Sequence, residues 1–225
     1  GSINSTVSAN VDAGFSIVNY TGNQTASATV GHGLSKAPEM VIIKNRDAAG
    51  YGWLVGHDAI TWEKYVVLNT TAALNTEDVF NDTAPTASVF SPGGTTFGNK
   101  TGDEIIAYCF HSVEGYSAVG SYKGNGNANG TFVYTGFRPA YVMVKRTENS
   151  DNWFIWDAKR NTYNVMNTVL KANESSADSS DSAYRIDFTS NGFKLRDDFS
   201  GINTSEKYIY LAFAETPFKY SNGRW

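Results

Sequence analysis

Short β-branched and aromatic runs, separated by polar turns, recur along the whole chain. Met40–Lys44 (MVIIK) and Tyr141–Lys145 (YVMVK) each begin just after a proline, which is typical of a strand that starts beyond the proline ring. Glu104–Phe110 (EIIAYCF) and Lys207–Phe213 (KYIYLAF) are almost continuously apolar, as central strands with two covered faces are. No segment longer than ten residues has a helical period, so the pattern predicts an all-β fold.

The same succession of runs occurs twice, with a period of about 102 residues. Matching aromatic, glycine, asparagine and proline positions are Tyr20 with Tyr122, Gly22 with Gly124, Asn23 with Asn125 and Pro38 with Pro139. The pattern predicts two tandem, pseudo-symmetric β-sandwich-like repeats, residues 14–117 and 118–225. It leaves open whether they share one core or form separate sandwiches. Residues 1–13 are interpreted as a cloning scar (Gly1-Ser2) followed by a linker.

The stretch Lys123–Gly130 (KGNGNANG) looks like a glycine-rich loop that could bind a phosphate. A dinucleotide-binding loop needs the spacing G-x-G-x-x-G and a following helix. Here the glycines are Gly124, Gly126 and Gly130, and the run that follows, TFVYTGF, is typical of a strand. A P-loop is excluded as well, because no Gly-Lys-Ser/Thr follows. We therefore interpret the stretch as a turn between two strands.

Composition and charge narrow the range of partners. A formal net charge of -4 argues against broad electrostatic binding of nucleic acid or of an anionic membrane. No apolar run approaches the roughly 18 residues that a membrane span needs, so membrane insertion is not expected. Cys109 is the only cysteine and lies in an apolar run, which predicts a buried, inert thiol. Aromatic residues make up 14% of the chain, enough to fill a core and still supply a binding surface.

A mixture of aromatic and polar residues after the first hairpin of each repeat suits carbohydrate, because aromatic faces stack on sugar rings while polar side chains bond hydroxyls. The candidate ligand-binding residues are Tyr51, Trp53, His57, Asp58, Trp153, Trp156, Asp157, Arg160 and Asn161. Trp53 and Trp153 occupy matching positions in the two repeats. This favours the interpretation that both pack in the core over the interpretation that they contact a ligand. Trp156 matches Gly56 and precedes a charged run, so we expect its ring to be exposed.

Nothing in the sequence requires catalysis, and we predict no catalytic residue and no metal ligand. The carboxylates that a glycosidase would need are present, Asp187 and Glu215 among them, but the sequence places no pair across a cleft. The three histidines are scattered and match no metal or triad motif. Residues 75–82 (NTEDVFND) could hold Ca²⁺, but solvated turns have the same composition, so no cofactor is assigned.

Long motifs in both halves carry a family resemblance. The second half contains YKGNGNANGTFVYTGFRPAYVMVKR (122–146), WDAKRNTYN (156–164), IDFTSNGFKLR (186–196) and YIYLAFAETPFKY (208–220). The first contains GFSIVNYTGN (14–23), VGHGLSKAPEMVIIKNR (30–46) and IIAYCFHSVEGYS (105–117). Together they resemble a domain that recurs in structural proteins of tailed bacteriophages, many of them marine. One departure is FHSVEGYS, where Phe-Ala-Glu is expected, as in Phe213-Ala214-Glu215.

The resemblance implies a tail-fibre or tail-tip module, located on the virion outside the cell, that attaches to polysaccharide or other glycans of the host surface without catalysis. Its other partners would be virion proteins, and the module would be a homotrimer in a fibre. Two alternatives stay open: a decoration or fibre-shaft domain without a ligand, and a polysaccharide depolymerase.

Overall fold

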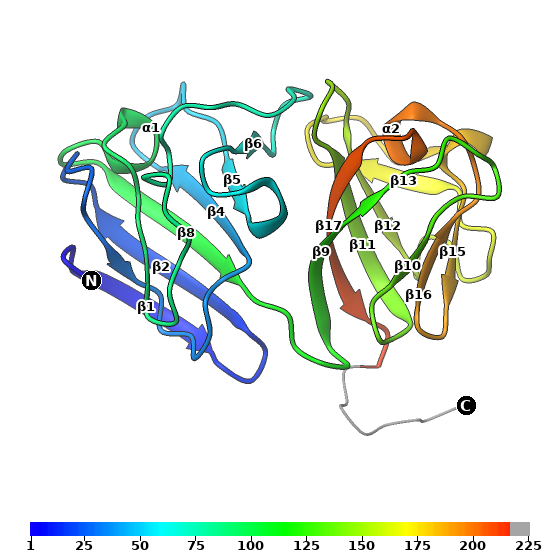
Figure 1. The fold of residues 1–225 in the computed structure, drawn as a ribbon, viewed down its shortest axis with the longest axis horizontal. Coiled ribbons are helices and arrows are strands. Elements are labelled where there is room, and N and C mark those ends of the chain that lie inside the picture. The colour runs from blue at the N-terminus through cyan, green and yellow to red at the C-terminus, as the bar shows by residue number, and fades with distance from the viewer. Residues whose placement is uncertain (217–225) are drawn as a thin grey trace. The chain divides into compact units, whose positions relative to one another are not determined.

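The computed structural model of the chain describes residues 1–216 and divides it into two compact units, Gly1–His111 and Ser112–Trp225 (Figure 1). Strand accounts for 40% of the residues and helix for 6%, which confirms the all-β prediction. Along the chain, the boundary between the units lies between residues 111 and 112, not between 117 and 118 as predicted. A tight turn from Val113 to Ser117 already leads into the first strand of unit 2. Residues 217–225 of the predicted second repeat lie outside the described part.

Unit 1 consists of a six-stranded and a two-stranded sheet, both antiparallel. Across the larger sheet the strands are β1 (Ser5–Asn10), β2 (Phe15–Thr21), β8 (Glu104–Phe110), β4 (Met40–Asn45), β5 (Leu54–His57) and β6 (Val66–Val67). The smaller sheet pairs β3 (Val30–Gly31) with β7 (Val89–Phe90), and the helical turns are η1 (Asp58–Ile60) and α1 (Thr96–Asn99). The apolar run of β8 lies between β2 and β4, as its composition predicts.

The interpretation of the residues after Gly1-Ser2 as a linker is wrong. Ser5–Asn10 forms β1, which pairs with β2 over its whole length, and Ile3 forms a bridge to Val30. The sequence pattern hid this strand because β1 lies at the edge of the sheet. Its side chains are almost all exposed, so it lacks the alternation of apolar and polar residues that marks a strand over a core.

Unit 2 has a six-stranded sheet and a three-stranded sheet, again antiparallel. The larger sheet runs β14 (Ser179–Ser180), β13 (Thr168–Lys171), β12 (Trp153–Asp157), β11 (Pro139–Arg146), β17 (Lys207–Ala214) and β9 (Ser117–Lys123). The smaller sheet runs β10 (Phe132–Tyr134), β16 (Gly192–Leu195) and β15 (Ile186–Thr189), with helical turns η2 (Ser182–Tyr184) and α2 (Ser200–Asn203). Strands β15 and β16 are joined by a tight turn of two residues, Ser190 and Asn191. The Asn-Gly pair at 191–192 is typical of such a hairpin.

Each unit has its own hydrophobic core. One buried cluster of apolar side chains lies wholly in unit 1, from Ile3 to Cys109, and the other wholly in unit 2, from Ala118 to Ala212. The alternative of one core shared by both repeats therefore does not describe this structure. The same buried hydrogen bond occurs in both cores: Tyr20 donates its hydroxyl to Gly98 O at 2.6 Å, and Tyr122 donates to Ile202 O at 2.7 Å. These matching bonds support the predicted duplication.

The stretch KGNGNANG joins β9 to β10, so it is a connection between strands as predicted. The backbone geometry of this turn requires its glycines. A Cβ atom on Gly124 would lie 2.0 Å from the Thr204 carbonyl oxygen, and Gly126 has a φ of +63°.

A buried asparagine, Asn203 of α2, holds this turn in place. Its Oδ1 accepts a hydrogen bond from Asn125 N at 3.1 Å, while its Nδ2 donates to Asn127 O and Asp197 O, both at 2.8 Å. Asn99 of α1 accepts a hydrogen bond from the matching turn of unit 1 in the same way. The side chain of Asn203 thus replaces water for backbone groups that the turn removes from solvent.

We predict that Asn203→Ala lowers the free energy of unfolding by about 2–3 kcal/mol, because the buried backbone groups of the turn lose their partner. The matched control is Asn129→Ala in the same loop, whose side chain is exposed and which should change stability by less than about 0.5 kcal/mol. Urea unfolding followed by tryptophan fluorescence measures both. Equal effects of the two substitutions would contradict the role of Asn203.

Candidate functional site

The predicted site residues of unit 1 do not form a ligand surface. Trp53 is half-buried and stacks on Tyr108, with ring centroids 6.1 Å apart. His57 is buried, and its Nδ1 accepts a hydrogen bond from a backbone N–H two residues on. Tyr51 is half-buried, and only Asp58 is exposed.

The expectation that the ring of Trp156 is exposed is wrong. Trp156 is 0% exposed, and its Nε1 donates a hydrogen bond of 2.8 Å to Tyr184 O. The matching Gly56 misled the prediction: a Cβ atom there would lie 2.6 Å from the ring of Trp62, so in unit 1 an aromatic ring from another segment packs over this position. Both positions are in a core, and the glycine does not indicate a surface.

The remaining predicted residues of unit 2 stabilise the loop after β12. Trp153 is buried on the face of β12 opposite Trp156. Arg160 forms an ion pair of 2.9 Å with Asp157, while Asn161 Oδ1 accepts hydrogen bonds from two backbone N–H groups of the segment before β13. The structure therefore brings Asp157 and Arg160 together, but as partners of each other and without an exposed tryptophan beside them.

The exposed aromatic side chains of unit 2 lie instead on β10. Phe132 is 44% and Tyr134 67% exposed, whereas Val133 between them points into the core. The sequence analysis treated this run only as a strand. The signal that could have found the site is the alternation Phe-Val-Tyr, which places two aromatic rings on the face away from the core.

Polar side chains of the neighbouring strands share this outer face. Lys194 of β16 pairs with Phe132 on one side and with Asp187 of β15 on the other. Asp187 forms an ion pair of 3.3 Å with Arg196. We call the outer surface of this three-stranded sheet the aromatic face; its residues are Phe132, Tyr134, Asp187, Thr189 and Lys194.

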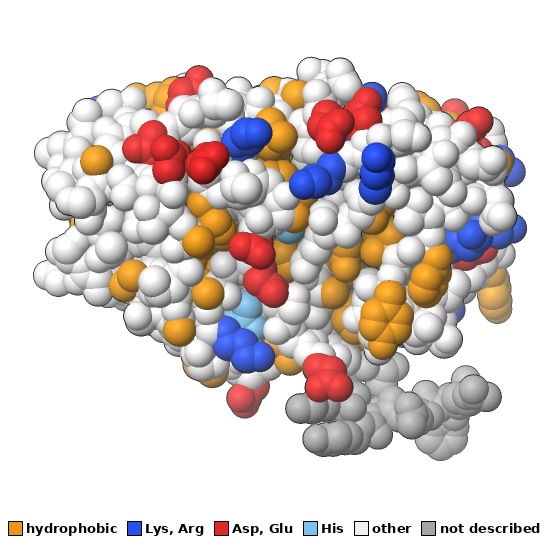
Figure 2. Space-filling model, viewed as in Figure 1, with side chains coloured by type: hydrophobic (Ala, Val, Ile, Leu, Met, Phe, Trp, Pro, Cys, Tyr) orange, Lys and Arg blue, Asp and Glu red, His pale blue; other side chains and the backbone are white. Residues whose placement is uncertain are grey.

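A missing side chain shapes the aromatic face. Gly192 is opposite Tyr134 in the register, and a Cβ atom on it would lie 3.1 Å from the Phe132 ring. The Phe132 ring therefore packs directly against the backbone of Gly192, and no side chain projects from the sheet at this position. In Figure 2, orange side chains gather on the surface of unit 2 around β10.

A third exposed aromatic residue flanks the other edge of this sheet. Tyr163 is 84% exposed, in the loop that follows β12. The adjacent Asn164 fixes this loop to β15: its Nδ2 donates to Phe188 O and its Oδ1 accepts from Phe188 N, both at 2.9 Å. Exposed aromatic residues therefore stand at both edges of a sheet three strands wide, roughly 10 Å at the usual strand spacing.

The corresponding region of unit 1 is covered. There β1 lies against β3, with the Ser5 hydroxyl donating to Gly31 O at 3.0 Å. A Cβ atom on Gly33, just after β3, would lie 2.8 Å from a methyl group of Val7 in β1. Unit 1 thus has glycines and a covering strand where unit 2 has exposed rings.

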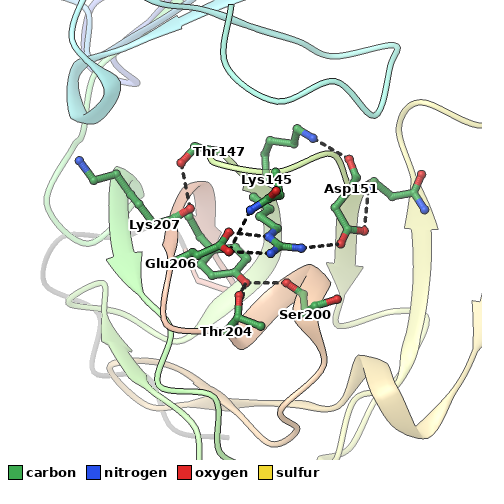
Figure 3. A network of polar contacts seen from close by, with 11 residues as sticks. Lys145, Thr147, Asp151, Ser200, Thr204, Glu206 and Lys207 are labelled. Atoms are coloured by element: carbon green, nitrogen blue, oxygen red, sulfur yellow. Dashed lines mark hydrogen bonds and ion pairs between the residues drawn. The ribbon is translucent and has the colours of Figure 1, made fainter.

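A second polar feature of unit 2 is the network in Figure 3. At its centre Arg146 donates two hydrogen bonds of 2.7 Å to Glu206 and lies 3.7 Å from Asp151. Tyr208 donates its hydroxyl to Ser200 O at 2.6 Å. The network ties the end of β11 to the loop before β17, and both carboxylates are paired with Arg146, so its geometry is that of a structural clamp.

Lys145 is a buried amine at the edge of this network. Its Nζ donates a hydrogen bond of 2.6 Å to Asp151 O. Burial lowers the pKa of Lys145 to about 8, and the nearby Asp151 charge offsets only part of that effect. The ammonium form is therefore disfavoured in the fold.

Residues 1–216 contain no cluster of three or more His, Cys, Asp or Glu placed to hold a metal ion. Cys109 is buried as predicted, and burial raises its pKa to about 12, so its thiol stays protonated and unreactive. None of the helices in this range has the length and hydropathy needed to cross a bilayer.

These features define a two-unit, antiparallel, all-β protein with a sandwich-like architecture and an exposed aromatic face on its second unit. The family described as "Domain of unknown function (DUF7483)" matches residues 1–217, so the chain belongs to that family. No curated protein and no solved structure matches it.

We predict that the free energy of unfolding of the wild type rises relative to that of Lys145→Met between about pH 8 and pH 10. The pKa of Lys145 is lower in the fold than in the unfolded chain, so in this range the unfolded state holds more protons on Lys145, and the contribution of Lys145 to stability increases with pH. Chemical unfolding across this range measures the slope. The exposed Lys36→Met is the matched control and should keep the wild-type slope; an unchanged slope in Lys145→Met would contradict the assignment.

Proposed function

We propose that the chain is a non-catalytic receptor-binding module of a bacteriophage tail fibre or tail tip, which attaches the virion to glycans of the host surface. The observation that carries the glycan-binding part is the exposed pair of rings, Phe132 and Tyr134, on a rigid antiparallel sheet.

The chemistry of the aromatic face supports carbohydrate as the ligand. Two aromatic rings exposed on the same face of one strand form an apolar surface, and a sugar ring offers a matching apolar face. Lys194 donates one hydrogen bond of 2.9 Å to Gly130 O and keeps further N–H donors of its ammonium group for sugar hydroxyl groups beside the rings. The strands fix the backbone beneath all of these side chains, so little conformational entropy is lost on binding.

The viral part of the proposal is supported by the family resemblance of the sequence motifs. A single flat face of this kind binds weakly, and a fibre that presents three copies raises the effective affinity through multivalency. This fits an assembly of the chain as a homotrimer among other virion proteins, outside the cell.

We predict that Tyr134→Ala, and more strongly Phe132→Ala with Tyr134→Ala, weakens binding to host capsular polysaccharide or lipopolysaccharide about three- to tenfold for each ring removed. Both side chains are exposed, so the variants should stay folded by circular dichroism. Glycan-array binding and biolayer interferometry with purified host polysaccharide measure the effect. The matched control is Asp58→Ala, an exposed residue of unit 1 that is not part of the aromatic face, which should bind like the wild type; Arg160→Ala tests the loop after β12.

The outcomes separate the proposal from its rivals. Loss of binding in the Arg160 or Asp58 variant, with Tyr134→Ala unaffected, would move the site back to the loops after β12 or β5. Failure of the wild type to bind any host polysaccharide or to compete with phage adsorption would indicate a structural module without a ligand. Release of new reducing ends would indicate a depolymerase.

A further inference from the structure

The loop after β12 extends the three-stranded sheet of unit 2 beyond β15. Met166 exchanges two backbone hydrogen bonds with Ile186 of β15, of 2.8 and 2.9 Å, in an antiparallel bridge. The side chain of Asn164 makes the corresponding two bonds, both of 2.9 Å, with the backbone of Phe188. This is the pairing pattern of an antiparallel strand, so residues 164–166 act as a fourth strand at this edge of the sheet.

The same register places Tyr163 in line with Tyr134. Continuing the pairing by one residue beyond Asn164 brings Tyr163 opposite Thr189. Thr189 is opposite Gly192 of β16, and Gly192 is opposite Tyr134 of β10. We call this line of four residues the aromatic row; neighbouring strands lie about 4.8 Å apart, so the row is roughly 14 Å long.

The Phe132 ring leans from β10 onto the second position of the aromatic row. A Cβ atom on Gly192 would lie 3.1 Å from this ring, so the ring occupies the space above β16 that a side chain would fill. Diagonal neighbours in an antiparallel pair are within reach of an aromatic side chain, which is the geometry seen here. Exposed rings therefore stand over β16 and at Tyr163, two strand spacings or roughly 10 Å apart.

Thr189 lies between these two rings. Its hydroxyl donates a hydrogen bond of 2.9 Å to Gly192 O, which holds the short side chain against the β15–β16 hairpin. The two central positions of the aromatic row are thus a glycine and a small polar residue, and a ligand is able to lie across the strands from one ring to the other.

The spacing of the rings selects a class of glycan. One pyranose residue of an extended glycan is about as long as one strand spacing, so a chain across the strands advances by one residue for each strand. In a β-1,4-linked chain successive residues are turned over, and every second residue presents the same face to one side. Rings two spacings apart therefore meet equivalent faces of two such residues, whereas an α-1,4-linked chain coils and does not present this repeat.

We propose that the aromatic row binds a linear β-1,4-linked glycan that lies across the strands and spans at least three sugar residues. The first of these residues stacks on Phe132, the second lies over Thr189 and the third stacks on Tyr163. Tyr134 meets a further residue at the β10 end of the row. This inference rests on the proposed glycan-binding function and goes beyond it by naming the linkage and the length of the ligand.

The test is a titration of the ¹⁵N-labelled full chain with cello-, chito- and manno-oligosaccharides of one to six residues. Malto-oligosaccharides of the same lengths are the α-1,4-linked comparison. We expect saturable shifts of the backbone amides of Phe132, Gly192, Thr189 and Tyr163 with at least one β-1,4-linked series. The Kd should fall about tenfold or more from disaccharide to trisaccharide, because a sugar held on the first ring raises the effective concentration at the second. Malto-oligosaccharides should bind about tenfold more weakly or not at all.

Two variants of Tyr163 sharpen this test. Tyr163→Ala should abolish the gain from disaccharide to trisaccharide and leave disaccharide binding as in the wild type, because only the second ring is lost. Tyr163→Phe keeps the ring and should keep the wild-type dependence on length. The Tyr163 side chain is 84% exposed, so both variants should stay folded. Val11→Ala, an exposed apolar residue of unit 1, is the matched control and should bind like the wild type.

The outcomes distinguish this inference from the proposed function. Binding of host polysaccharide that depends on Phe132 and Tyr134, without binding of any β-1,4-linked series, would overturn the inference and leave the proposed function standing. Equal binding of malto-oligosaccharides, or an unchanged length dependence in Tyr163→Ala, would overturn the inference as well. Failure of both the host polysaccharide and all four series to bind would overturn the inference together with the proposed function.

Discussion

Successive side chains of a β-strand point to opposite faces of its sheet, and this alternation decides which residues of the chain can meet a ligand. In β12 it sends Phe154 and Trp156 into the core of unit 2. In β10 it sends Val133 inward and leaves Phe132 and Tyr134 exposed. The same rule places Lys123 outside while its neighbour Tyr122 fills the core. The registers of the sheets then decide which exposed side chains become neighbours.

The two units use one plan differently. In both, a buried asparagine fixes the turn that follows β2 or β9, and a tyrosine hydroxyl from that strand donates a hydrogen bond within the core. Unit 1 adds β1, which covers β3, and closes the end of its sheet with a hydrogen-bonded Thr21–Glu104 pair. Unit 2 leaves an aromatic face uncovered.

Several features could be predicted because local chemistry decides them. The apolar runs of β8 and β17, the Asn-Gly hairpin between β15 and β16, and the turn KGNGNANG each carry their own signal in adjacent residues. The edge strand β1 carried none, since an exposed edge needs no apolar face. The exposure of Trp156 was predicted wrongly for a related reason: aromatic residues are common both in cores and on surfaces, so residue type alone did not show that Trp156 is buried and Tyr134 exposed.

By itself the sequence determined the all-β class, the position of the long apolar strands along the chain and the turn between β9 and β10, because hydrophobic period and turn chemistry act over a few neighbouring residues. Only the tertiary structure decided which aromatic rings are exposed, that residues 5–10 belong to a sheet, and that Tyr163 lies in line with Tyr134. Each of these depends on pairing between segments far apart in the chain, and a strand's own residues do not specify its partner or register.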